Sequence, residues 1–216
     1  MEIVLQCPIK MGTTRTGWHH ELKSLDDFKR CIFQGFGDKL IDYSFMGLVA
    51  HNGLDIGLEN GDEVFASHDG TANFQEDSKK GLGVVITTQG YKTIYWHLKD
   101  CVQPLNSTWQ VKKGDLIGHG DSTGFSTGPH LHYGLKLLDS NGNVLNRDNG
   151  YDGAVSLIEH VVWWDTMNDV EVRKLYRLAF YREPDAGELA FWSGRSLAEF
   201  LTVALKDRAE FLSSPL

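Results

Sequence analysis

Short alternating segments interrupted by glycine run from Phe33 to about Leu138, and they restrict the fold more than any other feature of this chain. They include DEVFA, GVVITT, YKTIYWHLK and HLHYGLKLL. Alternation of apolar and polar residues is typical of half-buried β-strands, and the glycines between them suit tight turns. We therefore predict an α+β chain whose main part, residues 33–150, is an all-β domain built on an antiparallel sheet.

The segments on either side of this region carry a different pattern. Residues 1–32 form a mixed N-terminal extension, in which Ser24 can cap a short helix that would place Leu25, Phe28 and Ile32 on one face. After the polar connector NRDNGYDG, a helical periodicity predicts a small α-helical module over residues 155–216. Its two apolar stripes are Val172, Leu175, Tyr176 and Ala179, followed by Leu197, Phe200, Leu201 and Ala204.

Charge and apolar content exclude several classes of partner. The formal net charge of the 216-residue chain is −8, which leaves no broad basic face for a phosphate backbone, so we expect no nucleic-acid binding. The opening MEIVLQCPIK lacks the basic and apolar regions of a secretory signal, and no later stretch is long and apolar enough to be a transmembrane helix. The sequence indicates no particular oligomeric state.

Candidate metal ligands occur first in the segment HNGLDIG. His51 and Asp55 are four residues apart, and Gly53 together with Ile56 and Gly57 favours a turn that runs into a strand over a helix. Either geometry can bring both side chains to one ion. Taken alone, the pair is also what a chance pair on the surface would look like.

Two further histidines lie in the segment GPHLHY. Alternation along a strand places His130 and His132 on one side and Leu131 and Tyr133 on the other. Two imidazoles on one face are costly to bury without a partner, and zinc binds neutral imidazole nitrogen. A shared site centred on a metal would therefore account for this pattern.

The segment TIYWHL contributes a fourth histidine. Strand alternation predicts His97 on the face of Thr93 and Tyr95, with Ile94, Trp96 and Leu98 on the apolar core face. His97 would then be presented to a site. The alternative is a histidine that is only hydrogen-bonded at a strand end.

Two other catalytic patterns fit this chain poorly. The GFSTG segment at residues 124–128 matches GxSxG, but that motif needs a strand before it and a helix after it, whereas Pro129 and a strand follow here. We interpret the segment as a turn. The sequence contains no HExxH, so a helical zincin site is excluded.

Together these segments resemble zinc endopeptidases of the LytM and lysostaphin type, peptidase family M23. The resemblance covers about half of the chain, and STGFSTGPHLHY is its most specific part. The matching segments occur in the family's order: QGFG (34–37), HNGLDIG (51–57), NGDEVFASHDG (60–70), GLGVVITTQGYKTIYWHL (81–98) and VKKGDLIGHGDSTGFSTGPHLHYGL (111–135).

The resemblance implies a role for each of five residues. His51, Asp55 and His132 would bind Zn²⁺, while His97 and His130 would be catalytic without binding the metal. It implies a metallo-endopeptidase that hydrolyses peptide bonds in bacterial peptidoglycan, within the stem peptide or the cross-bridge. The alternative is a catalytically silent protein of this fold that binds or regulates the cell wall. The expected setting is a phage lysin, a virion component, or a mature secreted enzyme.

The C-terminal region has a resemblance of its own. LYRLAFYREPDAGELAFW (175–192) and SLAEFLTVALKDRAEF (196–211) resemble a small helical domain found on bacterial surface and secreted proteins. Pro184 and Asp185 can start a helix there. The module would either bind the wall or a partner, or serve as a structural cap on the β domain.

Overall fold

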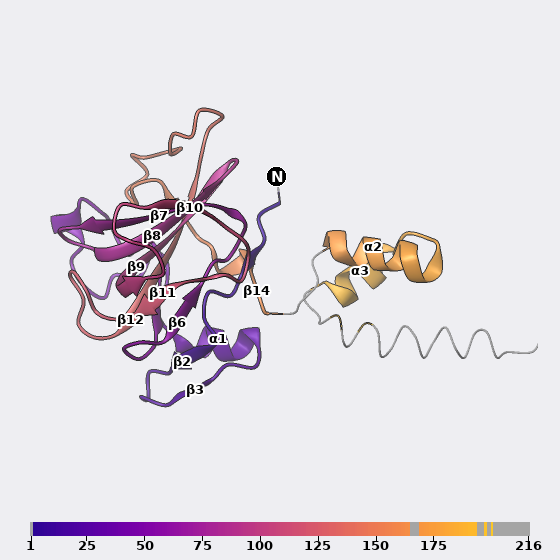
Figure 1. The fold of residues 1–216 in the computed structure, drawn as a ribbon, viewed down its shortest axis with the longest axis horizontal. Coiled ribbons are helices and arrows are strands. Elements are labelled where there is room, and N and C mark those ends of the chain that lie inside the picture. The colour runs from indigo at the N-terminus through magenta and orange to yellow at the C-terminus, as the bar shows by residue number, and fades with distance from the viewer. Residues whose placement is uncertain (1, 165–168, 194–196, 198–199, 201–216) are drawn as a thin grey trace, which may run out of the picture. The chain divides into compact units, whose positions relative to one another are not determined.

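The computed structural model describes residues 2–164, 169–193, 197 and 200 (Figure 1). The chain divides into two compact units, Met1–Val161 and Val162–Leu216. In the described part of the chain, no helix combines the length and the apolar character needed to cross a bilayer.

The first unit is built around a twisted antiparallel sheet, and Figure 1 shows its strands β7, β8 and β9 side by side. The strands follow the order β10-β7-β8-β9-β12-β5-β4, with β11 pairing with β6 and β9, and β13 pairing with β12. This confirms the predicted α+β class and antiparallel sheet. The strands are β4 (Ile32–Gln34), β5 (Leu54–Gly57), β6 (Glu63–Phe65), β7 (Gly70–Asp77), β8 (Gly81–Thr88), β9 (Tyr91–Cys101), β10 (Thr108–Val111), β11 (Leu116–Gly120), β12 (His130–Leu137) and β13 (Ala154–Val155).

The described part of the N-terminal extension, residues 2–32, packs as part of this first unit. They form β1 (Leu5–Gln6), β2 (Met11–Thr13), β3 (His19–Glu21) and α1 (Leu25–Cys31), and Leu5, Cys7 and Ile9 are fully buried. The predicted cap of α1 is confirmed, because the backbone N–H of Asp27 donates to Ser24 Oγ at 3.1 Å. The expected helical face ends early, since Ile32 already belongs to β4.

The helical periodicity expected from residue 155 begins later in the structure. β13 pairs with β12, and β14 (Val161–Val162), where the first unit ends, pairs with β1. A short 3₁₀ helix, η2 (Ile158–His160), lies between them. Strands of two residues carry no periodicity that a sequence pattern could reveal, and backbone pairing with distant strands decides their conformation.

The second unit contains α2 (Asp169–Phe180) and α3 (Ala186–Trp192). Asp185 caps α3 in a reciprocal capping box with Glu188, as the Pro-Asp pair predicts. Val172, Tyr176, Trp192 and Phe200 form its buried core, with Leu175, Phe180 and Leu189 packed against them. In the second predicted stripe Phe200 is buried and Leu197 is exposed, whereas Leu201 and Ala204 lie outside the described residues.

Candidate metal centre

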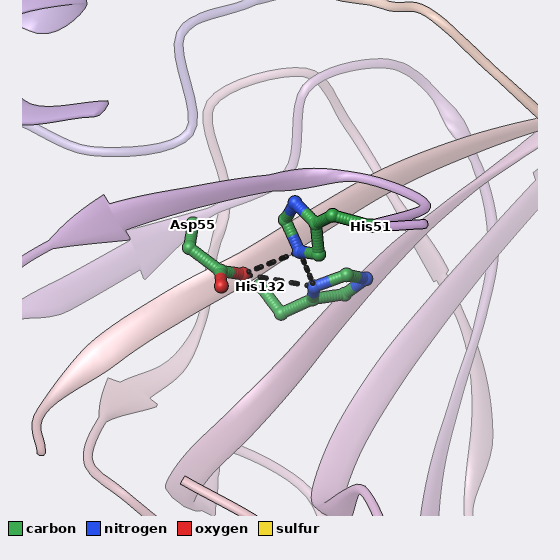
Figure 2. A group of neighbouring side chains, drawn as sticks. All are labelled: His51, Asp55 and His132. Atoms are coloured by element: carbon green, nitrogen blue, oxygen red, sulfur yellow. Dashed lines mark hydrogen bonds and ion pairs between the residues drawn. The ribbon is translucent and has the colours of Figure 1, made fainter. Parts of the chain in front are cut away.

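Three side chains from two paired strands and the turn before one of them converge on one point (Figure 2). Asp55 on β5 lies directly opposite His132 on β12, and His51 precedes β5 in the turn. His132 Nδ1 is 2.9 Å from Asp55 Oδ1, His51 Nε2 is 3.0 Å from the same oxygen, and the two ring nitrogens are 3.1 Å apart. The antiparallel register thus brings together residues that are far apart in the sequence.

The far side of the His51 ring is fixed by the backbone. His51 Nδ1 lies 3.0 Å from the carbonyl oxygen of Gly35, an acceptor, so Nδ1 carries the hydrogen and donates it. The lone pair is then on Nε2, the atom that faces Asp55. A hydrogen bond of this kind from a histidine to a backbone carbonyl is typical of metal-binding imidazoles, because it sets the tautomer and the ring orientation.

Asp55 is ionised in this setting. Burial alone raises the pKa of its carboxyl, but hydrogen bonds and charge interactions with His132 and His51 lower that pKa well below its ordinary value. Burial also lowers the pKa of His132, which keeps its ring neutral near pH 7. The site therefore offers the anionic oxygen of Asp55 and the neutral imidazole of His132, with Nε2 of His51 facing the same point.

This donor set fits a zinc ion. Ligand atoms about 2.0–2.1 Å from a tetrahedral centre lie roughly 3.3 Å apart, and the three donor atoms here are only slightly closer together. With Nδ1 of His51 donating to Gly35, its Nε2 offers a lone pair 3.0 Å from the Asp55 oxygen, a spacing that suits two ligands of one cation. Three protein ligands also leave a fourth position, as in catalytic zinc sites.

His97 and His130 lie beside this centre with their rings fixed in the same way. His97 Nδ1 donates to the carbonyl of Thr123 at 2.7 Å, and His130 Nδ1 donates to that of Gly128 at 2.8 Å. In the part of the chain that the structure describes, neither Nε2 atom forms a hydrogen bond, and the two ring centroids are 4.6 Å apart. His130 Nε2 is 3.7 Å from Asp55 Oδ1, whereas His132 Nδ1 is 2.9 Å from the same oxygen. The predicted common face of His130 and His132 is confirmed.

The predicted orientation of β9 is wrong on one point. Thr93 and Tyr95 are fully buried in the core, while Ile94 and Trp96 line the same groove as His97. The alternation breaks because the β8–β9 register shifts next to Trp96, and His97 adopts a positive φ of 68°. This bulge gives β9 one additional residue, which turns His97 towards the groove.

His97 is buried and uncharged. Burial, together with the neighbouring rings of His130 and His132, lowers its pKa to about 4. A neutral ring with a free Nε2 can accept a proton. A non-glycine residue with positive φ is uncommon and costs conformational energy, and such residues cluster at functional sites.

The groove above these histidines is bordered by aromatic side chains. The ring of Phe125 lines it and packs against Phe45 at 4.8 Å between centroids. Ser126, the serine of the GxSxG match, donates to the carbonyl of Gly128, and β12 follows instead of a helix. The interpretation of this segment as a turn is confirmed.

The elements that orient the imidazoles could not be identified from side chains. They are the backbone carbonyls of Gly35, Thr123 and Gly128. A carbonyl has no residue-specific signal, so only the segments QGFG and STGFSTG mark where they lie.

Gly53 should be required for metal affinity. A Cβ atom there would lie 2.8 Å from the His132 ring and 2.7 Å from the carbonyl of Tyr133. We expect Gly53→Ala to displace the ring and to weaken zinc binding by about tenfold to a hundredfold, the range seen when the support of a ligand is lost. Competition with a zinc chelator measures this. Gly128→Ala is the control, because nothing lies within 4 Å of its Cβ position. Equal zinc affinity in both variants would contradict the role of Gly53.

Comparison with known proteins agrees with this geometry. Residues 49–147 match the model of peptidase family M23. Over 99 residues the chain is 37% identical to the DD-carboxypeptidase/endopeptidase Mpg of Neisseria meningitidis. This match covers 44% of this chain and 21% of Mpg. It is 34% identical over 111 residues to the peptidoglycan DD-endopeptidase ShyA of Vibrio cholerae, covering 50% and 25%.

Among solved structures, a zinc-containing peptidase from Vibrio cholerae is 27% identical, covers 59% of this chain and 35% of its own, and has a TM-score of 0.45. The matches to Mpg and ShyA span about a quarter of those relatives or less. The resemblance noted from the sequence is confirmed by the family match. Residues 49–147, a little under half of the chain, thus form a domain that matches peptidase family M23.

Proposed function

We propose that this protein is a zinc-dependent endopeptidase that hydrolyses peptide bonds in bacterial peptidoglycan. The observation that carries the proposal is the constellation of five residues in one groove. His51, Asp55 and His132 offer three converging donor atoms, and two further imidazoles beside them have free Nε2 atoms. A catalytically silent protein that only binds the wall would have little use for three metal-binding side chains and two further histidines, whereas an enzyme requires them.

His51 Nε2, Asp55 Oδ1 and His132 Nδ1 would hold the zinc ion. The chemistry that zinc supplies at such a site is polarisation of the scissile carbonyl and activation of water near neutral pH. His97 and His130 would act on the same reacting atoms through Nε2. One neutral ring can take a proton from the attacking water, and the other can stabilise the developing oxyanion or protonate the leaving amine.

Peptidoglycan is proposed as the substrate because two relatives carry names that refer to it or to DD-peptide bonds. The test is to digest purified walls of known chemistry with the zinc-loaded protein and to identify new amino termini by mass spectrometry. We expect one class of new terminus. Zinc-loaded protein that binds walls but releases no new terminus from any of them would favour the silent binding protein instead. The phage setting stays a prediction, on which this test does not depend.

The helical unit is proposed to raise activity on walls without contributing to the chemistry, because none of the five site residues belongs to it. A chain ending after Trp164 should cleave a small soluble peptide as the full chain does. Its rate on intact walls should fall, since local concentration at the polymer is lost.

Thermal unfolding of the shortened chain separates the two roles left open for this unit. If the unit is a structural cap, truncation should lower the melting temperature and both activities together. Equal wall activity with and without the unit, at an unchanged melting temperature, would rule out targeting.

A further inference from the structure

The face of the sheet that carries the metal centre continues past it in an ordered way. Along β12, alternation places Gly134 and Lys136 on the same side as His132. On β9 their cross-strand partners are Ile94 opposite Gly134 and Lys92 opposite Lys136. The groove is lined by His132, Ile94, Lys80 and Lys136, so it runs from the metal centre to two lysines, and Lys92 lies opposite Lys136 on the neighbouring strand.

The floor between these two ends is open. Gly134 projects no side chain into it, although a Cβ atom there would be in ordinary van der Waals contact with Asn52 O and Ile94 Cβ, both at 3.7 Å. Four residues of a strand span about 13 Å. A lysine side chain covers part of that distance. A peptide bound at the metal centre could therefore reach the lysine end with only a few of its residues.

The lysine end holds more positive charge than its acidic neighbour can balance. Lys136 is 5% exposed and pairs with Asp152, and Arg147 lies 4.0 Å from that same carboxylate. Lys80 lies over the Trp96 ring at 5.5 Å and also lines the groove. In the described residues no ion pair within 4.0 Å joins Lys80 or Lys92 to a carboxylate, although the charge of Asp77 acts on Lys80 and that of Asp152 on Lys92. Such a surplus of cations is unusual in a chain with net charge −8.

We propose that this end of the groove is a subsite for a carboxylate of the substrate peptide, bound by Lys80 and Lys92 beside Lys136. The proposal rests on the proposed function, because it names a part of the peptide that the endopeptidase would recognise. The ammonium groups would form charge-assisted hydrogen bonds with the carboxylate, while Trp96 and Ile94 would contact the peptide between that carboxylate and the scissile bond.

The charge balance of the subsite supports an anionic ligand. Burial lowers the pKa of Lys92, and the nearby Arg147 and Lys80 lower it in the same direction, whereas Asp152 opposes them. Burial likewise lowers the pKa of Lys136, although Asp152 opposes this. Desolvated cations that repel one another are stabilised by an incoming negative charge.

The carboxylate of Asp152 already neutralises part of the positive charge at this subsite. Removing it should therefore strengthen carboxylate binding, the opposite of the effect expected from removing a lysine. The φ of Asp152 is 53°, a conformation that asparagine tolerates well. Asp152→Asn should therefore keep the backbone while it removes the only carboxylate that competes with the substrate for Lys136 and Arg147 in the described residues.

The experiment uses fluorescent wall stem peptides in which all carboxylates are free, or in which each is amidated in turn. Binding is measured by anisotropy and cleavage by kcat/KM, for the full zinc-loaded chain and for three variants. Lys80→Gln and Asp152→Asn change the subsite. Lys99→Gln is the matched control, because Lys99 is an exposed lysine on β9 that lies outside the groove.

Amidation of one particular carboxylate should weaken binding to the unmodified chain by about tenfold or more. Lys80→Gln should lose most of that preference, Asp152→Asn should increase it, and Lys99→Gln should keep it. The subsite is wrong if no amidation matters, or if Lys80→Gln and Lys99→Gln discriminate alike.

The two proposals fail in different ways in this experiment. If the peptides are cleaved but carboxylate and amide forms bind equally, the subsite is wrong and the proposed function stands. If no peptide is cleaved but the carboxylate form binds more tightly and depends on Lys80, the proposed function fails and the subsite stands.

Discussion

Replacement of His132 by alanine is expected to abolish zinc retention and peptide hydrolysis together. His132 Nδ1 is one of three converging donor atoms, and its loss leaves one imidazole and one carboxylate. A site with two protein ligands holds zinc far more weakly than a site with three, so we expect metal affinity to fall by more than about a hundredfold. Metal analysis by mass spectrometry on the dialysed protein, with peptide turnover on the same sample, measures both losses.

The control for this experiment is another histidine on the same sheet. His119 on β11 pairs with Asp100 at 2.6 Å and takes no part in the metal centre. His119→Ala should retain zinc and turnover. Full zinc occupancy in His132→Ala would show that His132 is not a ligand, and His130, whose Nε2 is 3.7 Å from Asp55, would then be the candidate to replace it.

Much of the metal centre could be predicted because strand alternation and a specific motif point the same way. The common face of His130 and His132 follows from alternation alone, and β12 has that geometry. The meeting of His132 with His51 and Asp55 did not follow from spacing. It depends on the β5–β12 register, which only the family resemblance could imply.

The orientation of His97 could not be predicted by the same reasoning. A regular strand would have kept His97 on the buried face of Thr93 and Tyr95, but the bulge beside Trp96 turns it to the groove face. Bulges add one residue to one strand, and no residue in TIYWHL marks the position. Tertiary pairing with β8 decides it.

Two other features could not be predicted from the sequence for a related reason. They are the short strands of residues 154–162 and the backbone carbonyls around the site. A two-residue strand has no period, and a carbonyl has no side-chain identity. The helix at Leu25–Cys31 was predictable by contrast, because Ser24 supplies a local cap and Phe28 faces the core.

Replacement of His97 should separate metal binding from catalysis. The His97 ring is held by a hydrogen bond to the Thr123 carbonyl, and its centroid is 6.1 Å from that of His132. His97 is not one of the three donors. We expect His97→Ala to retain zinc and to lose turnover by about a hundredfold or more, the usual contribution of a general acid-base or electrostatic group.

The backbone at this position requires a second variant before that result can be interpreted. The φ of His97 is 68°, so a change there can alter the bulge as well as remove the imidazole. Asparagine occurs more readily at positive φ than most residues, and His97→Asn should keep the bulge while it lacks the ring. Both variants should bind zinc normally and turn over slowly, with kcat reduced more than KM is raised, because the lost interaction acts mainly in the transition state. Normal turnover in His97→Asn would remove His97 from the mechanism and leave it a histidine that is hydrogen-bonded within a strand.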